Sequence, residues 1–311
     1  MTPQKTWVGI DVCKAFLDVQ VLPQGLTLQM PNSTSGIEQL IEQLQPLAPI
    51  SIVLEATGGL ERQVMERLQS ANLPISRVNP RQVRGLATGL GKAKTDALDA
   101  IVLATFAQLV KPRVQPHVDV HAQQLSDLVR RRQQLVAMQV AEKNRLSSAP
   151  TTVQVDIREH LQQIQQRIES LNGQIQTLAQ TQQDWQRKNT ILNSVKGIGK
   201  VTSNLCLAEL PELGKLSEKQ IARLVGVAPL NHDSGKHKGK RRIAGGRTSV
   251  RCGLYMATLV ATRHNPVIRA FYQKLLERGK LKKVALIACM RKLLIILNAL
   301  IRDNKTWQAP A

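Results

Sequence analysis

TWVGIDVCKAFLDVQV, residues 6–21, decides the fold of the N-terminal part of this chain. Its first half is apolar and β-branched and runs to an acid, and its second half alternates apolar and polar residues, so the stretch predicts two consecutive strands. After a Pro/Gly turn, residues 26–30 predict a third strand, and residues 36–47 have helical spacing. The nearly continuous apolar run ISIVL at 50–54 is typical of a strand that is covered on both faces.

Alternating elements continue beyond this run. Residues 60–70 predict a helix, residues 74–78 a strand, and TDALDAIVLATFAQLV at 95–110 a helix for which Thr95 is a fitting cap. Three strands, a helix and then alternating strands and helices indicate an α/β domain around a mixed sheet. This is the order of the ribonuclease H fold, and we expect such a domain over residues 1–115.

The next part of the chain has a different texture. From about His121 to Arg187 it is rich in Gln and Arg, and its apolar residues step by three and four, as one helix face does. Pro150 predicts a break between two long helices, so we interpret residues 116–188 as a coiled-coil-like spacer or dimerising arm. A hairpin that lies along a nucleic-acid duplex is the alternative, which the modest charge favours less. Residues 189–311 predict a compact, mainly α domain with helices near 248–264 and 282–302.

Charge separates the two ends of the chain. The 311 residues include 43 Lys plus Arg against 22 Asp plus Glu, a net charge of +21. Residues 185–311 hold 25 basic and 6 acidic side chains, whereas residues 1–110 hold 9 of each. A soluble protein this basic usually meets a polyanion, so we expect the C-terminal part to bind nucleic acid.

Cysteine spacing and hydropathy indicate the compartment. The four cysteines are far apart and form no CxxC pair, which argues against a zinc site or a disulfide framework. The N-terminus has no signal-peptide core, and Arg291 and Lys292 interrupt the longest apolar stretch, Val284 to Ile301. We therefore expect a cytoplasmic protein whose last apolar helix is buried rather than membrane-spanning.

Four acids stand where a metal site would form. Asp11 ends the first strand, Glu55 ends the ISIVL strand before a Thr-Gly-Gly turn, and Asp96 and Asp99 share one face at the start of a helix. Hard Mg²⁺ (or Mn²⁺) prefers such oxygen ligands, and two such ions clamp the attacking and leaving oxygens of a phosphodiester. Each acid alone is more often a strand-end or helix-start charge. The four together predict metal-dependent phosphodiester chemistry.

Two C-terminal segments predict phosphate contacts. Lys196-Gly197-Ile198-Gly199-Lys200 lies between two helix-like stretches and looks like the turn of a helix-hairpin-helix element, although a packing turn is the alternative. The second segment, residues 236–251, has seven Lys or Arg and no acid, which a solvated face would also explain. Its basic residues are Lys236, Lys238, Lys240, Arg241, Arg242, Arg247 and Arg251.

A serine directly precedes this basic run. The hydroxyl of Ser234, next to Gly235 in a loop rich in cations, has the chemistry to attack a phosphorus while Arg and Lys stabilise the added negative charge. Most loop serines are only turn formers. From the residues alone, Ser249 remains a second candidate for the nucleophile.

The motifs resemble one family. IDV with Asp11, LEATGG with Glu55, and KTDALDA with Asp96 and Asp99 look like the DEDD tetrad of the insertion-sequence-110 transposases, a group that includes Piv-like invertases. SVKGIGKVTSN, VGVAPLNHDSG and GGRTSVRCGLYMATL resemble the second conserved domain of that family. The resemblance spans essentially the whole chain in the family's order.

The resemblance implies a mechanism and partners. It implies a RuvC-like N-terminal domain whose four acids hold Mg²⁺, and a nucleophilic serine at Ser234 that forms a covalent phosphoserine–DNA intermediate. It also implies donor and target DNA, a guiding bridge RNA and a homo-oligomer (dimer or tetramer). We expect a transposase or site-specific DNA recombinase. The alternatives are a Mg-dependent, Holliday-junction-type endonuclease and, less favoured, a non-catalytic nucleic-acid-binding protein.

Overall fold

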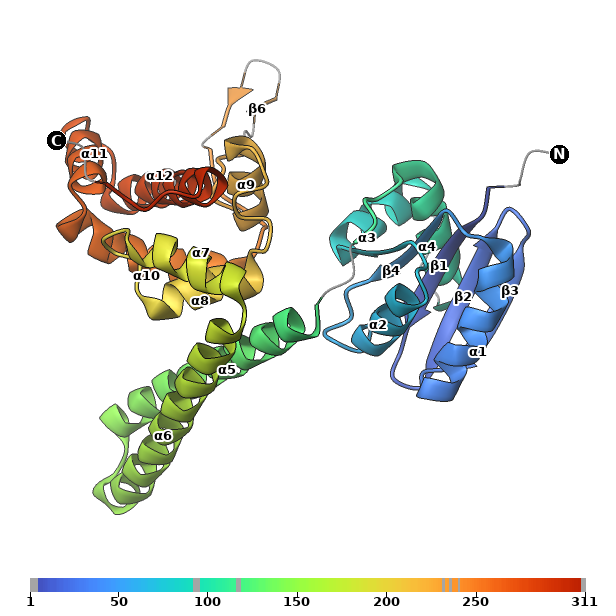
Figure 1. The fold of residues 1–311 in the computed structure, drawn as a ribbon, viewed down its shortest axis with the longest axis horizontal. Coiled ribbons are helices and arrows are strands. Elements are labelled where there is room, and N and C mark those ends of the chain that lie inside the picture. Colours follow the sequence, from blue (N-terminus) through green and yellow to red (C-terminus); the bar gives the residue numbers. More distant parts are fainter. Residues whose placement is uncertain are drawn as a thin grey trace. The chain divides into compact units, whose positions relative to one another are not determined.

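The chain divides into two compact units, residues 1–118 and residues 119–311. The computed structural model describes residues 5–91, 96–115, 119–230, 233–234, 237–239 and 241–308, of which residues 96–98, 233–234 and 237–238 are described by their backbone only. Each unit has its own hydrophobic core. Figure 1 shows the strands of the sheet in the first unit and mainly helices in the second.

The first unit is built on a mixed five-stranded sheet of order β3-β2-β1-β4-β5. The first three strands are antiparallel neighbours, and β4 and β5 run parallel to β1. This confirms the predicted mixed α/β sheet. The elements are β1 (Trp7–Val12), β2 (Phe16–Leu22), β3 (Leu26–Pro31), α1 (Thr34–Leu44), the 3₁₀ turn η1 (Gln45–Leu47), β4 (Ser51–Glu55), α2 (Arg62–Ser70), β5 (Ile75–Val78), α3 (Pro80–Gly89) and α4 (Asp96–Val110).

Helices cover both faces of this sheet. Val8 and Ile10 of β1 point to the face that α1 and α2 cover, whereas Trp7 packs with residues of α3 and α4 on the other face. Successive side chains of a strand alternate between faces, so the odd-numbered residues of β1 lie toward α4. Helix α3 was not predicted from the sequence; its N-cap residue is Asn79, whose side chain accepts a hydrogen bond from the Arg81 amide (2.9 Å).

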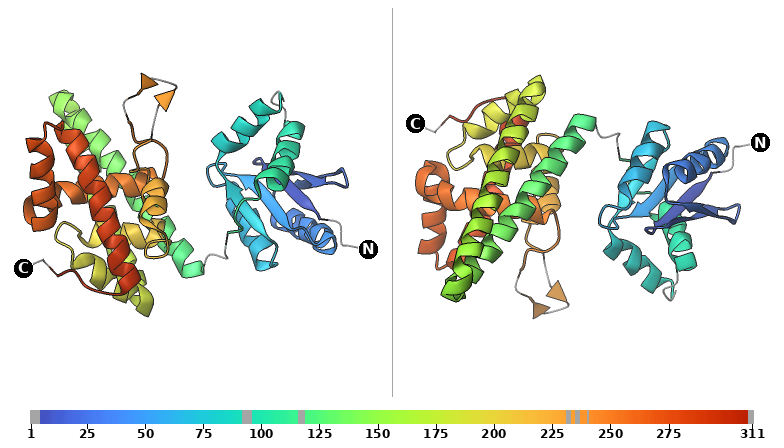
Figure 2. Two further views of the ribbon diagram at one scale, coloured as in Figure 1. Left: turned by 90° about the horizontal axis from the view of Figure 1, so that it is seen from above. Right: turned by 90° about the horizontal axis from the view of Figure 1, so that it is seen from below.

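The second unit is almost entirely helical. Its elements are α5 (Val120–Ser148), α6 (Thr151–Thr181), α7 (Gln183–Asn193), α8 (Lys200–Glu209), α9 (Glu218–Val225), the short strands β6 (Asp233–Ser234) and β7 (His237–Lys238), α10 (Thr248–His264), α11 (Pro266–Glu277) and α12 (Lys282–Asp303). Figure 2 shows α12 lying among the other helices of this unit. Although α12 is long and apolar enough to cross a membrane, Cys289, Leu293 and Leu297 along it are fully buried in the core.

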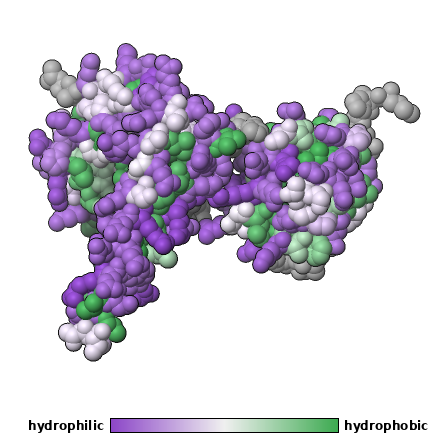
Figure 3. All heavy atoms as spheres, turned by 60° about the horizontal axis from the view of Figure 1, so that its bottom comes forward, coloured by the Kyte–Doolittle hydropathy of each residue, from purple (hydrophilic) through white to green (hydrophobic). Residues whose placement is uncertain are grey.

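Helices α5 and α6 form the predicted pair of long helices, and they end and begin on either side of Pro150. They run antiparallel, because Leu135 of α5 packs on Ile164 and Ile168 of α6, while Leu125 packs near Ile175. Most of the visible surface of this hairpin is hydrophilic, with a small apolar group at its free end (Figure 3). The base of the hairpin packs on Leu205 of α8, so the spacer and the basic helical part form one unit.

Candidate functional site

Two of the predicted acids lie side by side at the end of the central strands. Asp11 and Glu55 directly follow Ile10 and Leu54, the last registered pair between the parallel strands β1 and β4. Residues of both strands two positions earlier, Gly9 and Val53, face α4. The alternation of strand side chains therefore sends both carboxylates toward the α4 face of the sheet.

Close packing of α4 brings in the third acid. A Cβ atom on Gly9 would lie 2.2 Å from the Ala100 carbonyl oxygen and 2.3 Å from the Ala104 amide nitrogen, so only glycine allows the helix this close to β1. Asp99 immediately precedes Ala100 and is thereby held near Asp11, two residues along the strand from Gly9. Sequence reasoning missed this role of Gly9; a glycine inside an otherwise β-branched strand was the available signal.

The neighbouring carboxylates influence the pKa of Asp11. Burial, followed by the negative charges of Asp99 and Glu55, raises the pKa of Asp11 to about 6. Asp18 also contributes; it faces Asp11 in the antiparallel β1–β2 register and was not predicted as a site residue. The short connection between β1 and β2 was the signal for it, since a hairpin fixes which residues oppose each other.

A buried glutamate shapes the turn after Glu55. Glu61 is only 2% exposed, and its carboxylate accepts hydrogen bonds from the Gly59 amide (2.8 Å), the Thr57 hydroxyl (3.0 Å) and Arg77 (3.3 Å). Although burial raises the pKa of Glu61, these backbone and hydroxyl donors hold it below its usual value. Glu61 therefore fixes the Thr-Gly-Gly turn from within, a role that sequence reasoning missed.

The donor chemistry of this acid cluster suits a hard divalent cation. Asp11, Glu55 and Asp99 offer carboxylate oxygens from three different elements, and mutual repulsion among them is relieved when a cation binds. Among the side chains that the structure describes, no three His, Cys, Asp or Glu residues lie close enough to hold one ion. The side chain of Asp96, the fourth predicted ligand, lies outside the described residues; its backbone begins α4.

In the second unit, the KGIGK segment forms the predicted turn between α7 and α8. Gly197 has φ +109°, and a Cβ there would lie 2.9 Å from the Ala261 amide nitrogen, so the turn packs tightly on α10. Ile198 is buried, whereas Lys196 and Lys200 are exposed on either side. Gly199 is the N-cap residue of α8. Packing explains Gly197, and the phosphate-binding role of the two exposed lysines stays a prediction.

The two ends of the basic segment lie close together and form its base. Gly226 and Gly246 approach so closely that a Cβ on Gly246 would lie 2.3 Å from the Gly226 amide nitrogen, and Leu230 and Arg242 pair as an antiparallel bridge. Beyond this base, β6 and β7 pair with Ser234 opposite His237. The side chains of Ser234 and Lys238, and all of Lys236 and Lys240, lie outside the described residues.

The four described arginines of this segment differ in their surroundings. Arg241 and Arg242 are exposed. Arg247 instead forms a two-pronged ion pair with Glu212 (2.5 and 2.6 Å) and donates to the Glu209 carbonyl oxygen (2.9 Å). Arg251 donates to the backbone carbonyls of Val225 and Gly245. Arg247 and Arg251 thus hold the base of the segment together.

The second candidate nucleophile has a defined place. Ser249 lies in the first turn of α10, is partly exposed, and lines a cavity together with Thr248 and Cys252. The acids lie in the first unit and both candidate serines in the second.

Comparisons with known proteins connect both units to one family. Residues 8–153 match a family described as transposase, of the DEDD and IS110 type, and residues 189–273 match the transposase family IS116/IS110/IS902. The chain is 28% identical to the pilin gene-inverting proteins of Moraxella bovis and Moraxella lacunata, over 97% of its own length and 98% of theirs. It is 32% identical over 93 residues to an uncharacterized 42 kDa protein of insertion element IS900 from Mycobacterium paratuberculosis, which covers 29% of this chain and 23% of that one. A solved structure of T. thermophilus RuvC in complex with Holliday junction substrate aligns with a TM-score of 0.27 and 14% identity, over 36% of this chain and 100% of that one.

Proposed function

We propose a mechanism by which this chain cuts and joins DNA strands. The chain belongs to the IS116/IS110/IS902 family of transposases and is a DNA transposase or recombinase. Asp11, Glu55 and Asp99, together with Asp96, bind divalent metal, for which Mg²⁺ is the natural choice. Bound metal would supply positive charge for the phosphodiester oxygens that gain negative charge during transfer. The observation that supports the proposal is that Asp99 and Glu55 lie near enough to Asp11 for their negative charges, together with burial, to raise its pKa.

We propose Ser234 as the nucleophile. Its hydroxyl oxygen forms a bond to phosphorus and gives up its proton to solvent, while the bond from phosphorus to the deoxyribose oxygen breaks and that oxygen takes up a proton. The product is a phosphoserine link between protein and DNA, which the reverse reaction resolves onto a new strand. Support comes from the family resemblance of the Ser-Gly motif and from the exposed Arg241 and Arg242 on the same segment.

Partners and assembly follow from the same family. We propose that the chain acts on donor and target DNA, with a bridge RNA that pairs with both. We also propose a homo-oligomer in which the acids of one subunit act with Ser234 of another. Within each chain these groups belong to different compact units, which is consistent with a site that two subunits share.

A denaturing gel of DNA incubated with the protein tests this proposal. We expect a covalent adduct that Ser234→Ala abolishes and Ser249→Ala retains. Asp11→Asn should also abolish it without weakening DNA binding, because the basic residues of the C-terminal part supply the electrostatic attraction. Mixing the Ser234 and Asp11 variants should restore adduct formation if subunits share the site. Free cut ends without an adduct would instead indicate an endonuclease, and an adduct in Ser234→Ala would refute the assignment of the nucleophile.

A further inference from the structure

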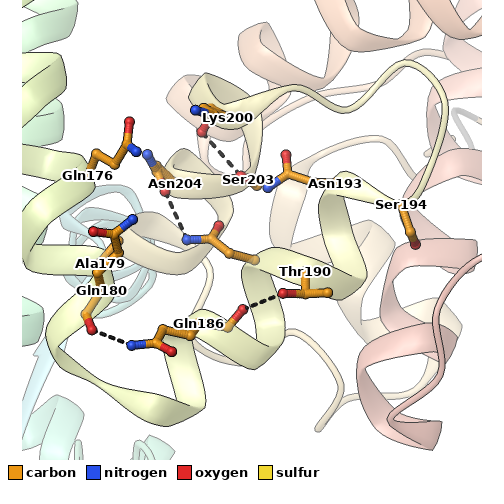
Figure 4. Close-up of a pocket in the computed structure, with 11 residues that line it drawn as sticks. Gln176, Ala179, Gln180, Gln186, Thr190, Asn193, Ser194, Lys200, Ser203 and Asn204 are labelled. Carbon is orange, nitrogen blue, oxygen red and sulfur yellow. Dashed lines mark hydrogen bonds between the residues drawn. The ribbon is translucent and has the colours of Figure 1, made fainter.

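A polar cavity lies in the second unit where α6, α7 and α8 meet. Its volume is about 720 Å³ (Figure 4). Apart from one alanine and Lys200, its lining consists of Asn, Gln, Ser and Thr, and no carboxylate is among the residues that form it. Such a lining carries many hydrogen-bond donors and acceptors but only one formal charge, so it suits a polar ligand that is neutral over most of its surface.

Several amides of this cavity have bonding capacity left. Asn189 donates through Nδ2 to Asn204 Oδ1 (3.2 Å), but its own Oδ1 is buried and has no hydrogen-bond partner in the part of the chain that the structure describes. The side-chain amides of Gln176 and Asn193 make no hydrogen bond to another described residue. Figure 4 shows Gln176 and Asn204 among the residues that line this cavity. A buried acceptor without a donor is costly to a fold, so it indicates a ligand that supplies one.

A second cavity lies next to the first. It has a volume of about 730 Å³ and shares Gln176, Lys200 and Asn204 with it. Its lining is mainly apolar and includes Arg132 of α5, whose Nε donates to Asn172 Oδ1 (2.6 Å). Burial lowers the pKa of Arg132. Neither Arg132 nor Lys200 forms an ion pair with a described acid, so the second cavity is lined by two cations without an anionic partner among the described residues.

We propose that these two adjacent cavities, which share Lys200, Gln176 and Asn204, bind one unpaired nucleotide of DNA or RNA. The base enters the amide cavity, where Asn and Gln side chains bond its edge, and Lys200 and Arg132 hold the adjoining phosphates. A paired base is excluded because its hydrogen-bonding edge is occupied by the opposite strand. The inference rests on the proposed nucleic-acid partner, but it is independent of the cleavage chemistry and of Ser234.

Fluorescence anisotropy with the full-length protein tests the inference. The probes are a labelled DNA duplex, the same duplex with one bulged nucleotide, and the same bulge without its base, each also made as RNA. We expect the bulged probe to bind about tenfold more tightly than the other two, a gain typical of base recognition through hydrogen bonds. Tighter binding of the bulged RNA would identify RNA as the source of the nucleotide, and tighter binding of the bulged DNA would identify DNA.

Substitutions of single residues test whether the two cavities are responsible for the tighter binding of the bulged probe. Asn204→Leu and Gln176→Leu should remove the gain and leave duplex affinity unchanged, whereas Gln174→Leu on the same helix should not alter it. Lys200→Ala should weaken binding of the bulged probe more than Lys219→Ala, an exposed lysine on α9 that carries the same charge. Gln176 is exposed and makes no side-chain hydrogen bond with a described residue, so its variant should fold even if Asn204→Leu loosens the α7–α8 contact.

Three results would overturn the inference. The first is a baseless bulge that binds as tightly as the complete one. The second is a loss of duplex affinity in the leucine variants that equals their loss of bulge affinity. The third is an absence of nucleic-acid binding altogether, which would refute the proposed function as well; the first two would leave that function standing.

Discussion

Removing one charge from the acid cluster should stabilise the metal-free fold. The pKa of Asp11 is raised to about 6 from an ordinary 3.8, so its proton binds more tightly in the folded chain than in the unfolded one. The free energy of unfolding must then fall as the pH rises from about 4 to about 6 and stay low above that range. Asp11→Asn should not lose stability in this way, because its side chain does not ionise. The side-chain amide has a shape similar to that of the carboxylate, and its oxygen can still accept a hydrogen bond from the Val12 amide.

The magnitude follows from the same values. The interval between 3.8 and about 6, at about 1.4 kcal/mol per pH unit, sets an upper limit of roughly 3 kcal/mol. Asp11 is partly exposed, and solvent screening should reduce this to about 1 kcal/mol. We therefore expect Asp11→Asn to be about 1 kcal/mol more stable than the wild type at pH 7.5 with EDTA, and equally stable near pH 3.5.

Urea unfolding can report this unit alone. Trp7 packs against residues of α4, on the face of the sheet that this helix covers. Replacing Trp185 and Trp307 with Phe leaves Trp7 as the only tryptophan, so that tryptophan fluorescence reports the unfolding of the first unit. Glu42→Gln, an exposed acid on α1, is the control that removes one charge elsewhere and should show no such gain. Excess Mg²⁺ or Mn²⁺ should reverse the order, because a cation that binds the folded wild type adds stability that the variant lacks. A variant that is no more stable than the wild type at pH 7.5 with EDTA would refute the reasoning.

Three further predictions follow from the packing and the charges. Gly9→Ala should lower the free energy of unfolding by about 1–3 kcal/mol, because α4 has to move away from β1. Gly85→Ala, whose added methyl group meets open space, should not lower it, and equal effects of the two variants in urea titrations would contradict this prediction. Arg247→Met should lower the free energy of unfolding by about 1–3 kcal/mol at neutral pH, because it leaves the half-buried carboxylate of Glu212 unpaired. This loss should shrink as the pH falls, because Glu212 then becomes protonated in both the folded and the unfolded chain. Charge reversal at Arg241 and Arg242 should weaken DNA binding about equally across sequences and reduce the slope of log K against log salt by about one for each phosphate that the variant no longer binds. An unchanged slope would show that these two residues only face solvent.

Much of the fold can be read from local periodicity. The alternation in residues 6–21, the apolar run at 50–54 and the helical spacing around Pro150 predicted β1, β2, β4, α5 and α6 to within a few residues. These patterns are reliable because a strand or helix buries one set of positions fixed by its own repeat. Helix α3 has only 10 residues and only one buried residue, Val83, so its apolar positions gave a weaker signal than those of the long helices.

The sequence by itself determined the chemistry available at each position: which strands end in carboxylates, where the cations gather and where glycine permits a turn. Tertiary structure decided how these groups are used. Because Gly9 has no side chain, α4 packs close to β1 and Asp99 lies near Asp11. The register of the β1–β2 hairpin places Asp18 opposite Asp11, and the ion pair with Glu212 gives Arg247 a structural role. Such outcomes depend on contacts between residues far apart in the chain. No local repeat encodes them, because they arise only when separate elements pack against one another.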